Sequence, residues 1–330
     1  MEALVPTLSA YLSEPIAVGD PDVAGPLAFF PLFGPTAEFP YQSFSQGAAH
    51  GVTIKELAGG ASINDLVVHN PTDLPVLLFE GEEVLGAQQN RTFDTSVLVP
   101  ARSTFEVAVS CVEAGRWDGR RHSEAFEPAP QAAYPSLRRL KNRAVLASVV
   151  SGAEARADQG AVWEEVDHKL DALAASAPTR AIHDGYEHRR RDLDELTAAC
   201  DLKPGQTGMV VAIGGDFAVL DRVSRPDVFA SLFGPLVQGY ALDALSAPDA
   251  EPPSRDDAER FVERVQAHGI HEHDAVGLGR DVRLIDAELT GAGLVHSGEL
   301  VQLSVFVGNA AGDGRARRVS RINRPSRRRR

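Results

Sequence analysis

The apolar positions in the first third of the chain recur at the spacing of short β-strands. In TFEVAVSCVE (104–113) every second residue from Phe105 to Cys111 is apolar, and this period of two is typical of a strand with one buried face. Asn-Pro-Thr-Asp at 70–73 is a turn signal, and Gly81 interrupts a later apolar run. Strands are predicted at 27–33, 51–57, 63–70, 74–86, 96–100 and 104–113. Short strands at this spacing predict an N-terminal antiparallel sheet or sandwich.

The middle of the chain has the pattern of helices. Between about 136 and 200 it is rich in Ala, Leu, Arg and Glu, and the apolar residues from Trp163 to Leu173 recur at helical spacing. Ser-Ala-Pro at 176–178 breaks this pattern. We therefore expect one helix before the break and a second helix that runs to about Cys200.

Strands and helices both return in the last third. Two strand patterns, at 208–215 and 217–223, meet at a Gly-Gly-Asp turn that predicts a hairpin. Pro226 predicts the start of a helix that runs to about Leu245, and Ser254 begins another helix with a capping-box pattern. The last strands are predicted at 282–289, 292–296 and 300–307.

The order of strands, helices and strands, without regular β-α-β alternation, favours the α+β class over a doubly wound sheet. The length of 330 residues allows one large domain or two modest ones. Because the returning strands can extend the first sheet, we expect a single α+β domain over 1–312, in which the C-terminal strands and helices rejoin the N-terminal part. Residues 313–330 are predicted to be an Arg-rich disordered tail.

Composition narrows the class of protein. No apolar run approaches the roughly 18–20 residues that a membrane helix needs, and the first residues lack the basic and apolar blocks of a signal peptide. Cys111 and Cys200 are too few for a disulfide framework, so we expect two reduced thiols. These features predict a cytoplasmic protein with no part embedded in a membrane.

The charge is distributed unevenly along the chain. The formal net charge is −13, yet residues 315–330 contain nine arginines and no acid, so the remainder is more acidic still. A basic segment of this kind can contact an acidic partner or the phosphates of a nucleic acid. It can equally be a solubilising end, and it lacks the aromatic residues that stack on bases.

The densest polar segment is EGEEVLGAQQNR (80–91), which follows a predicted buried strand. Gly81 and Gly86 allow the backbone to turn sharply or to approach a ligand closely. Side-chain amides can donate and accept hydrogen bonds, and a guanidinium can hold a phosphate or carboxylate through two parallel bonds. The residues of these kinds are Gln88, Gln89, Asn90 and Arg91. The alternative is a polar hairpin tip without a ligand.

A second polar group follows the alternating strand that ends near Cys111. It contains Glu113, Arg116 and Trp117. If the two preceding strands are neighbours, this group converges with the segment 80–91 at one end of the sheet. Paired carboxylates there could activate water or hold a divalent cation, and Trp117 could stack on a planar ring. The alternative is a structural Glu113–Arg116 pair with Trp117 packed over it.

Three other patterns are weaker indications of chemistry. His271 and His273 would lie on one face of a strand, but the sequence marks no further metal ligand beside them. Cys111 would need a neighbouring histidine to act as a nucleophile. Gly-Leu-Gly-Arg at 277–280 lacks the lysine and the glycine spacing of a phosphate-binding loop. No metal site is therefore assigned, although a divalent metal stays possible as a cofactor.

The run GEEVLGAQQNRTFDTSVLVPARSTFEVAVSCVEAGRW (81–117) resembles the ADP-ribosylglycohydrolase and rhodanese-phosphatase superfamily associated protein domain family. Looser likeness extends over most of the chain, and the Arg-rich tail looks like an addition outside it. The residues that match the family motif are Gly81, Glu82, Gly86, Gln88, Asn90, Arg91, Cys111, Glu113, Arg116 and Trp117. The resemblance implies a place in NAD or ADP-ribose metabolism without naming a reaction.

Two hypotheses follow. In the first, the protein binds an ADP-ribose-like nucleotide or processes it, for example by hydrolysis. Glu82 and Glu113 are then the catalytic carboxylates or bind ribose, the two arginines hold phosphate, and Trp117 stacks on the base. The expected ligand-binding residues are Gly81, Gly86, Gln88, Asn90, Arg91, Arg116 and Trp117.

In the second hypothesis, the protein is a non-catalytic interaction module whose polar cluster is structural and whose basic tail contacts a partner. An open cleft favours the first hypothesis, and a buried, fully paired cluster favours the second. Because both polar groups follow buried strands, we expect four residues to lie together at one end of the N-terminal sheet: Glu82, Arg91, Glu113 and Arg116.

Overall fold

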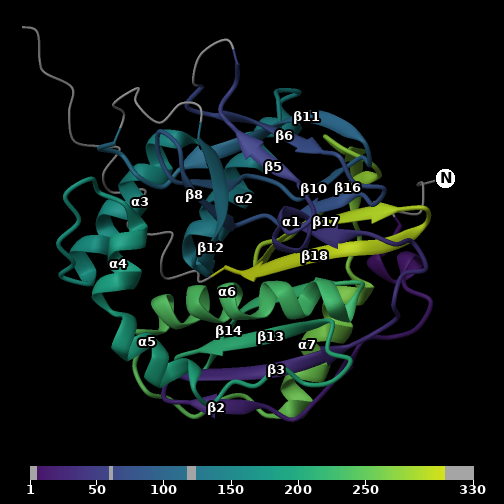
Figure 1. Ribbon diagram of the computed structural model, residues 1–330. Coiled ribbons are helices and arrows are strands. Elements are labelled where there is room, and N and C mark those ends of the chain that lie inside the picture. The colour runs from purple at the N-terminus through teal and green to yellow at the C-terminus, as the bar shows by residue number, and fades with distance from the viewer. Residues whose placement is uncertain (1–5, 59–61, 117–123, 309–330) are drawn as a thin grey trace, which may run out of the picture.

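The computed structural model describes residues 6–58, 62–116 and 124–308. Over these ranges the chain is a mixed α and β protein that contains two open sheets and a closed six-stranded barrel, with helices between and around them (Figure 1). The general prediction of mixed helices and strands is confirmed. Trp117 and the predicted tail at 313–330 lie outside the described residues. Among the helices of the described ranges, none combines the length and apolarity needed to cross a lipid bilayer.

The larger open sheet is antiparallel throughout. In sheet order its strands are β1 (Ala17–Val18), β3 (Leu27–Phe33), β13 (Gly208–Ile213), β14 (Asp216–Val223), β18 (Glu299–Val307), β17 (Leu289–His296), β16 (Arg280–Ile285) and β15 (His271–Asp274), and β2 (Asp22–Ala24) also pairs with β3. The predicted Gly-Gly hairpin between β13 and β14 is present. Gly214 and Gly215 have φ of 63° and 89°, which glycine adopts without steric strain.

The remaining N-terminal strands form a barrel and a small sheet. Around the barrel the order is β11 (Ser103–Cys111), β6 (Asp65–Asn70), β5 (Thr53–Lys55), β12 (Ala125–Ala132), β8 (Glu82–Gly86) and β9 (Arg91–Phe93). The small sheet contains β10 (Val97–Val99), β7 (Val76–Leu78) and β4 (Gln42–Ser43). Strand β11 pairs with β6 along its first part and with β9 along its last three residues, which closes the barrel.

The expected single N-terminal sheet or sandwich is therefore only partly correct. Strand β3 leaves the N-terminal group and pairs with β13, so the first and last thirds of the chain do share one sheet. Strands β1 and β2 pair with β3 in that sheet, whereas the other N-terminal strands form the small sheet or close into the barrel together with β12. Closure pairs strand edges that an open sheet would leave unpaired. Whether 1–312 is a single domain stays a prediction.

The α-helices occur in three regions of the described chain, at 44–48, 135–197 and 226–267. After the 3-10 turn η1 (Leu8–Tyr11), they are α1 (Phe44–Ala48), α2 (Pro135–Val150), α3 (Gln159–Ala172), α4 (Ile182–His188), α5 (Arg190–Thr197), α6 (Pro226–Ala244) and α7 (Arg255–Ala267). The predicted capping box of α7 is present, because the Ser254 hydroxyl accepts the N–H of Asp257 while the Asp257 carboxylate accepts the N–H of Ser254. The helix expected to run unbroken to Cys200 is divided into α4 and α5 at Arg189.

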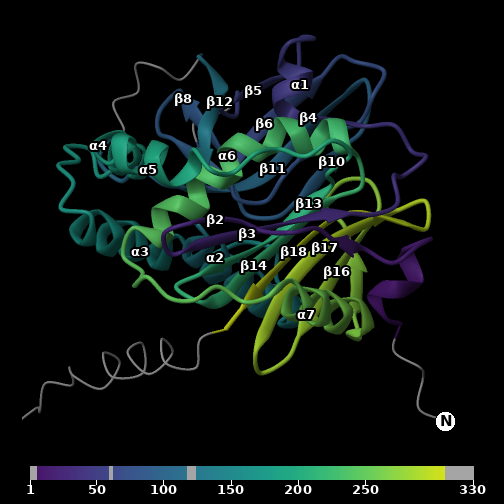
Figure 2. The same ribbon diagram turned by 90° about the horizontal axis from the view of Figure 1, so that it is seen from below.

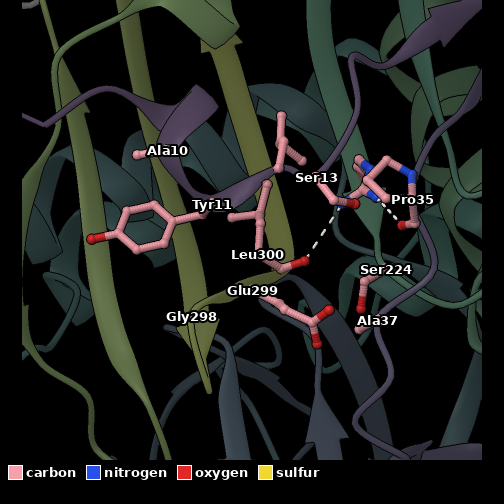
Figure 3. A pocket seen from close by; sticks show the side chains of 11 residues that line it. Ala10, Tyr11, Ser13, Pro35, Ala37, Ser224, Gly298, Glu299 and Leu300 are labelled. Atoms are coloured by element: carbon pink, nitrogen blue, oxygen red, sulfur yellow. Dashed lines mark hydrogen bonds between the residues drawn. The ribbon is translucent and has the colours of Figure 1, made fainter.

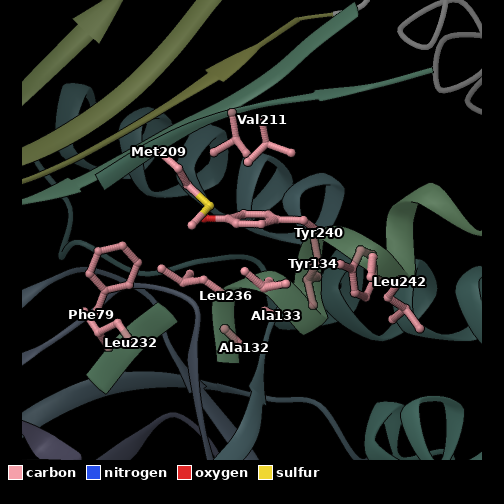
Figure 4. Packing of buried hydrophobic residues seen from close by; sticks show 14 of the residues in the cluster. Phe79, Ala132, Ala133, Tyr134, Met209, Val211, Leu232, Leu236, Tyr240 and Leu242 are labelled. Carbon is pink, nitrogen blue, oxygen red and sulfur yellow. The ribbon is translucent and has the colours of Figure 1, made fainter. Parts of the chain in front are cut away.

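The core has three parts, and the large sheet separates two of them. Helix α6 lies between the barrel and one face of β13 and β14 (Figure 1). In Figure 4, Met209 and Val211 of β13 lie above Tyr240 of α6, and Phe79 lies beside Leu232. Helix α7 packs on the opposite face of the sheet (Figure 2). A third cluster, which includes side chains of α1 and the small sheet, fills the barrel.

Strand β12 was not predicted, and it matters because it leads into α2. Its sequence AFEPAPQA contains Pro128 and Pro130, which cannot donate to a ladder and argue against a strand. Pro130 is tolerated because the pairing with β8 is interrupted between Pro128 and Ala132, whereas Pro128 remains in register opposite Val84. Pro135 then begins α2, where its missing N–H leaves no hydrogen bond unmade.

Candidate functional site

The polar segment 80–91 forms the hairpin of β8 and β9 at one end of the barrel. Gly86 has φ of 129°, and a Cβ there would lie 3.2 Å from the carbonyl oxygen of Ala125, so glycine is needed for the turn. Arg91 pairs with Val84 on one side and with Cys111 on the other. Since directly opposed residues share a face, Arg91 projects to the same side as Val84, whose side chain belongs to the barrel core.

Arg91 is fully buried and paired inside the chain. Its Nη2 lies 3.5 Å from Oε1 of Glu56, which is also buried, and its Nη1 donates to the backbone oxygen of Gln89 at 2.9 Å. Burial lowers the pKa of Arg91, and the negative potential of groups that include Glu56 and Glu113 opposes this shift. Arg91 and Glu56 therefore form a buried ion pair within the end of the barrel.

Arg116 and Glu113 attach the next polar group to the same hairpin. Arg116 donates to both carboxylate oxygens of Glu113, from Nε at 2.9 Å and from Nη2 at 2.8 Å. It also donates to the backbone oxygen of Ala87 at 2.7 Å and to Oδ1 of Asn90 at 3.1 Å. Burial raises the pKa of Glu113, but hydrogen bonds from Arg116, Thr179 and the Asn90 N–H outweigh it, and the net shift is downward. Glu113 is thus held as a carboxylate that binds the turn.

Three of the four residues expected to converge lie at this end of the barrel: Arg91, Glu113 and Arg116. Glu82 is the exception, because it begins β8 while the hairpin turn lies beyond Gly86. Its carboxylate accepts the backbone N–H of Phe79 at 3.1 Å, and burial raises its pKa to about 7. The two carboxylates expected to act together, Glu82 and Glu113, are therefore attached to different turns.

The amides of the segment are also enclosed. Gln88, Gln89 and Asn90 are each less than 10% exposed. Gln89 donates to the backbone oxygen of Ala114 at 3.3 Å, and the backbone N–H of Asn90 donates to Glu113 at 3.1 Å. The amide side chains and the guanidinium of Arg116 thus join the β8–β9 turn to the chain that leaves β11.

A second network, which the sequence analysis missed, connects the barrel to the large sheet. Arg138 of α2 donates to Oε1 of Glu80 at 2.6 Å, to both oxygens of Asp221 at 2.7 Å, and to the Ser304 hydroxyl at 3.0 Å. The Tyr240 hydroxyl donates to Asp221 at 2.6 Å. Arg138 is fully buried, and the two carboxylates raise its pKa although burial lowers it. The sequence signal that could have indicated the burial of Arg138 is its position next to Leu137, an apolar residue in a region with a helical pattern.

Gly81 belongs to this second network. It has φ of 82°, and a Cβ built on it would lie 2.6 Å from Cδ and Nε of Arg138. Glycine is therefore required here by the packing of a buried arginine as well as by the backbone conformation. The predicted interruption of the strand at Gly81 is confirmed, since β7 ends at Leu78 and β8 begins at Glu82.

Lys141, one turn after Arg138 on α2, is also buried. Its Nζ donates to the backbone oxygen of Phe93 at 2.7 Å and to the Thr92 hydroxyl at 3.0 Å, and it lies 3.6 Å from Oδ1 of Asp94. Burial lowers the pKa of Lys141, and Asp94 opposes that shift. Helix α2 therefore carries two buried cations whose partners lie mainly in the hairpin segment 80–94.

Glu83 has the most perturbed environment of the carboxylates in the segment 80–91. It is fully buried, and burial raises its pKa to about 8, while a hydrogen bond from Gln131 at 2.9 Å and the charge of Lys141 oppose the shift. Gln131 also contacts Nδ1 of His183 at 3.0 Å. The group is adjacent to a cavity of only about 70 Å³ that Gln131 lines, which is too small for a nucleotide.

Larger cavities lie elsewhere. Cavities of about 190, 350 and 420 Å³ are lined by none of the described residues that the sequence analysis selected for catalysis or ligand binding.

Within the described residues, no group of three or more His, Cys, Asp and Glu side chains could hold a metal ion. His271 and His273 do lie on a strand, β15. Cys111 and Cys200 are free thiols, and burial raises the pKa of each to about 12, which disfavours a thiolate nucleophile.

Comparison with models of protein families gives a match over most of the chain. A family model described as the ARG and Rhodanese-Phosphatase-superfamily-associated Protein domain matches residues 15–306, a range that contains both polar groups and both networks. The predicted resemblance is confirmed at the level of this description. Neither a curated protein nor a solved structure matches the chain.

Proposed function

The chain belongs to the ARG and Rhodanese-Phosphatase-superfamily-associated Protein domain family, and on that premise we propose that it is a non-catalytic interaction module. In this proposal the polar segment 80–116 is a structural network. The Arg-rich segment 313–330 is the basic arm that contacts an acidic partner or nucleic acid.

The observation that carries the proposal is the internal pairing of the charged side chains. Arg91 lies against Glu56, Arg116 is bound to both oxygens of Glu113, and Glu80 is bound to Arg138. A general acid or base must reach a proton on its substrate, and a phosphate-binding arginine must present donors to it. Here those donors and acceptors face other residues of the chain, which favours a structural role.

A second candidate function is binding or hydrolysis of an ADP-ribose-like nucleotide at the barrel end. It is favoured by the convergence of Arg91, Glu113 and Arg116, and by the side chain of Arg116, which is 22% exposed at the rim. The resemblance of the run 81–117 to a family that implies a place in NAD or ADP-ribose metabolism also supports it. In this case Arg91 and Arg116 hold phosphate and Glu113 binds ribose.

A thermal-shift titration distinguishes the two functions. The full chain and Arg116→Ala are melted alone and with ADP-ribose, ADP, NAD or divalent metal ions. The interaction-module proposal expects no ligand to raise the melting temperature of the wild type. It also expects Arg116→Ala to melt earlier without any ligand, because the change leaves the buried Glu113 without its main partner.

The opposite pattern would overturn the proposal. If ADP-ribose raises the melting temperature of the wild type in a saturable manner and this response disappears in Arg116→Ala, the barrel end is a nucleotide site. Ligand-free melting near that of the wild type in the same variant would show that the pair contributes little to the fold.

A further inference from the structure

Among the described residues, Arg222 is a buried cation without a carboxylate partner. It lies in β14, where successive side chains point to opposite faces of the sheet. Asp221 therefore projects toward α2 and α6, where Arg138 and Tyr240 bind it, while Arg222 projects to the other face. Arg222 is 1% exposed, and no Asp or Glu oxygen of the described residues lies within ion-pairing distance of its guanidinium.

This arrangement differs from that of the other large buried arginines. Arg91, Arg138 and Arg283 each have a carboxylate partner, in Glu56, Asp221 and Asp281 respectively. Arg222 donates only to backbone oxygens, to Pro35 from Nη2 at 2.6 Å and to Leu300 from Nη1 at 3.5 Å. Its Nε–H has no partner among the described residues. A buried charge in such a position is unfavourable unless something else neutralises it.

The guanidinium lines a cavity of about 190 Å³ on the η1 side of the sheet. Figure 3 shows this cavity between Ser13, Pro35, Ser224 and the turn that carries Gly298 and Glu299. Ser13 and Ser224 also line it, and hydroxyls can donate to an anion. The Ser224 hydroxyl lies 2.9 Å from the Tyr41 hydroxyl, and it can donate to an anion when it accepts the hydrogen bond from Tyr41.

Space remains beside the donors of Arg222. A Cβ built on Gly34 would lie 3.2 Å from both Nε and Nη2 of Arg222, so a larger residue at this position would crowd both donors. The lack of a side chain at Gly34 therefore leaves room next to the unbonded Nε–H. Two oxygens of one ligand group could approach Nε and Nη2 together, which is the fork geometry of arginine recognition.

We propose that this cavity binds a small oxyanion, the phosphate or carboxylate group of a ligand, through the Nε and Nη2 donors of Arg222 and the hydroxyls beside them. The oxyanion supplies the negative charge that the described residues do not place within ion-pairing distance of Arg222. Glu299 lies on the same wall and repels an anion, so it favours ligands small enough to remain close to the guanidinium.

Isothermal titration calorimetry on the full chain tests the proposal. Inorganic phosphate and acetate are titrated separately, with the ionic strength held constant by sodium chloride. We expect saturable binding of at least one anion, and the stronger of the two identifies phosphate or carboxylate as the natural group. Arg222→Met should weaken that binding more than tenfold, because it removes the fork of donors.

Two further variants make the result specific. Glu299→Gln leaves Arg222 intact and removes a repulsive charge, so it should bind the anion at least as tightly as the wild type. Gly34→Ala retains the charge but fills the space beside Nε, so it should bind at least several-fold more weakly, and it carries the test if Arg222→Met does not fold.

The absence of saturable binding of either anion to the wild type would overturn the proposal. Equal binding by the wild type and Arg222→Met, or by the wild type and Gly34→Ala, would also overturn it. Because nucleotides are absent from this experiment, its outcome is independent of whether ADP-ribose binds at the barrel end.

Discussion

At the scale of single residues, the glycines of the polar segment show how far a sequence can be interpreted. Gly81 and Gly86 were selected because they allow a turn or the close approach of a ligand, and both do adopt positive φ. What lies close to Gly81, however, is the side chain of Arg138 from a helix more than fifty residues later. The local requirement for glycine is visible in the sequence, whereas the identity of the neighbour depends on the tertiary fold.

Replacement of Gly81 tests this close packing. Gly81→Ala should destabilise the protein by about 2 kcal/mol or more beyond Gly205→Ala, measured as the free energy of unfolding in urea. Gly205 has φ of 76°, close to the 82° of Gly81, but nothing lies within 4 Å of a Cβ built there. Gly205→Ala therefore introduces the strain of an alanine at positive φ without a close contact like the one between a Cβ at position 81 and Arg138. Equal losses in the two variants would show that Arg138 can move away.

The buried carboxyl of Glu83 gives a prediction about pH. Its pKa is raised by burial from 4.5 to about 8, so between these values the unfolded chain has lost a proton that the folded chain retains. The contribution of protonated Glu83 to the free energy of unfolding is therefore fully present below about pH 4.5. This contribution is lost as the pH rises toward about 8, by up to about 1.4 kcal/mol per pH unit.

Glu83→Gln should remove this pH dependence, because the amide is neutral throughout. Urea unfolding at several pH values between 5 and 8 should show the variant gaining stability relative to the wild type as the pH rises. Glu82 titrates in an overlapping range, with a pKa raised to about 7, but it is present in both proteins and cancels in the difference. A constant difference across this range would contradict the prediction.

At the scale of elements, helix α2 contains buried cations whose roles its sequence pattern does not indicate. Its helical pattern was predicted, and Pro135 begins it. Its cations were assigned no role, because a charged residue on a helix is usually solvated. Arg138 and Lys141 face inward because carboxylates from the barrel and the sheet meet them there, and this complementarity exists only once three distant segments are assembled.

Arg138→Met should destabilise the protein by about 3–5 kcal/mol, because it leaves Glu80 and Asp221 buried without a counter-ion. The matched control is Arg143→Met on the same helix, where the side chain is exposed and the expected change is below about 1 kcal/mol. Both values come from urea unfolding monitored by circular dichroism. Similar stability of the two variants would show that Arg138 does not hold the barrel to the sheet.

At the scale of the whole molecule, the class of fold was predictable and the topology was not. The alternation in 104–113 identified β11, and the Gly-Gly turn identified the β13–β14 hairpin, since both signals are local. The closure of β9 on β11 and the pairing of β3 with β13 join residues far apart in sequence, and no local pattern encodes them. The candidate site follows the same division: the polar residues were identified, but whether they face a ligand or one another depends on that topology.

The proposed structural role of the polar segment 80–116 requires that its charged side chains stabilise the fold by pairing with one another. A double-mutant cycle on Glu113 and Arg116 tests it most directly. The free energies of unfolding of the wild type, Glu113→Ala, Arg116→Ala and the double variant are measured in urea without any ligand. The bidentate bond, at 2.8 and 2.9 Å, predicts a favourable coupling energy of about 1–2 kcal/mol. A coupling energy near zero, with both single variants as stable as the wild type, would contradict the claim and point to a ligand as the true partner of these side chains.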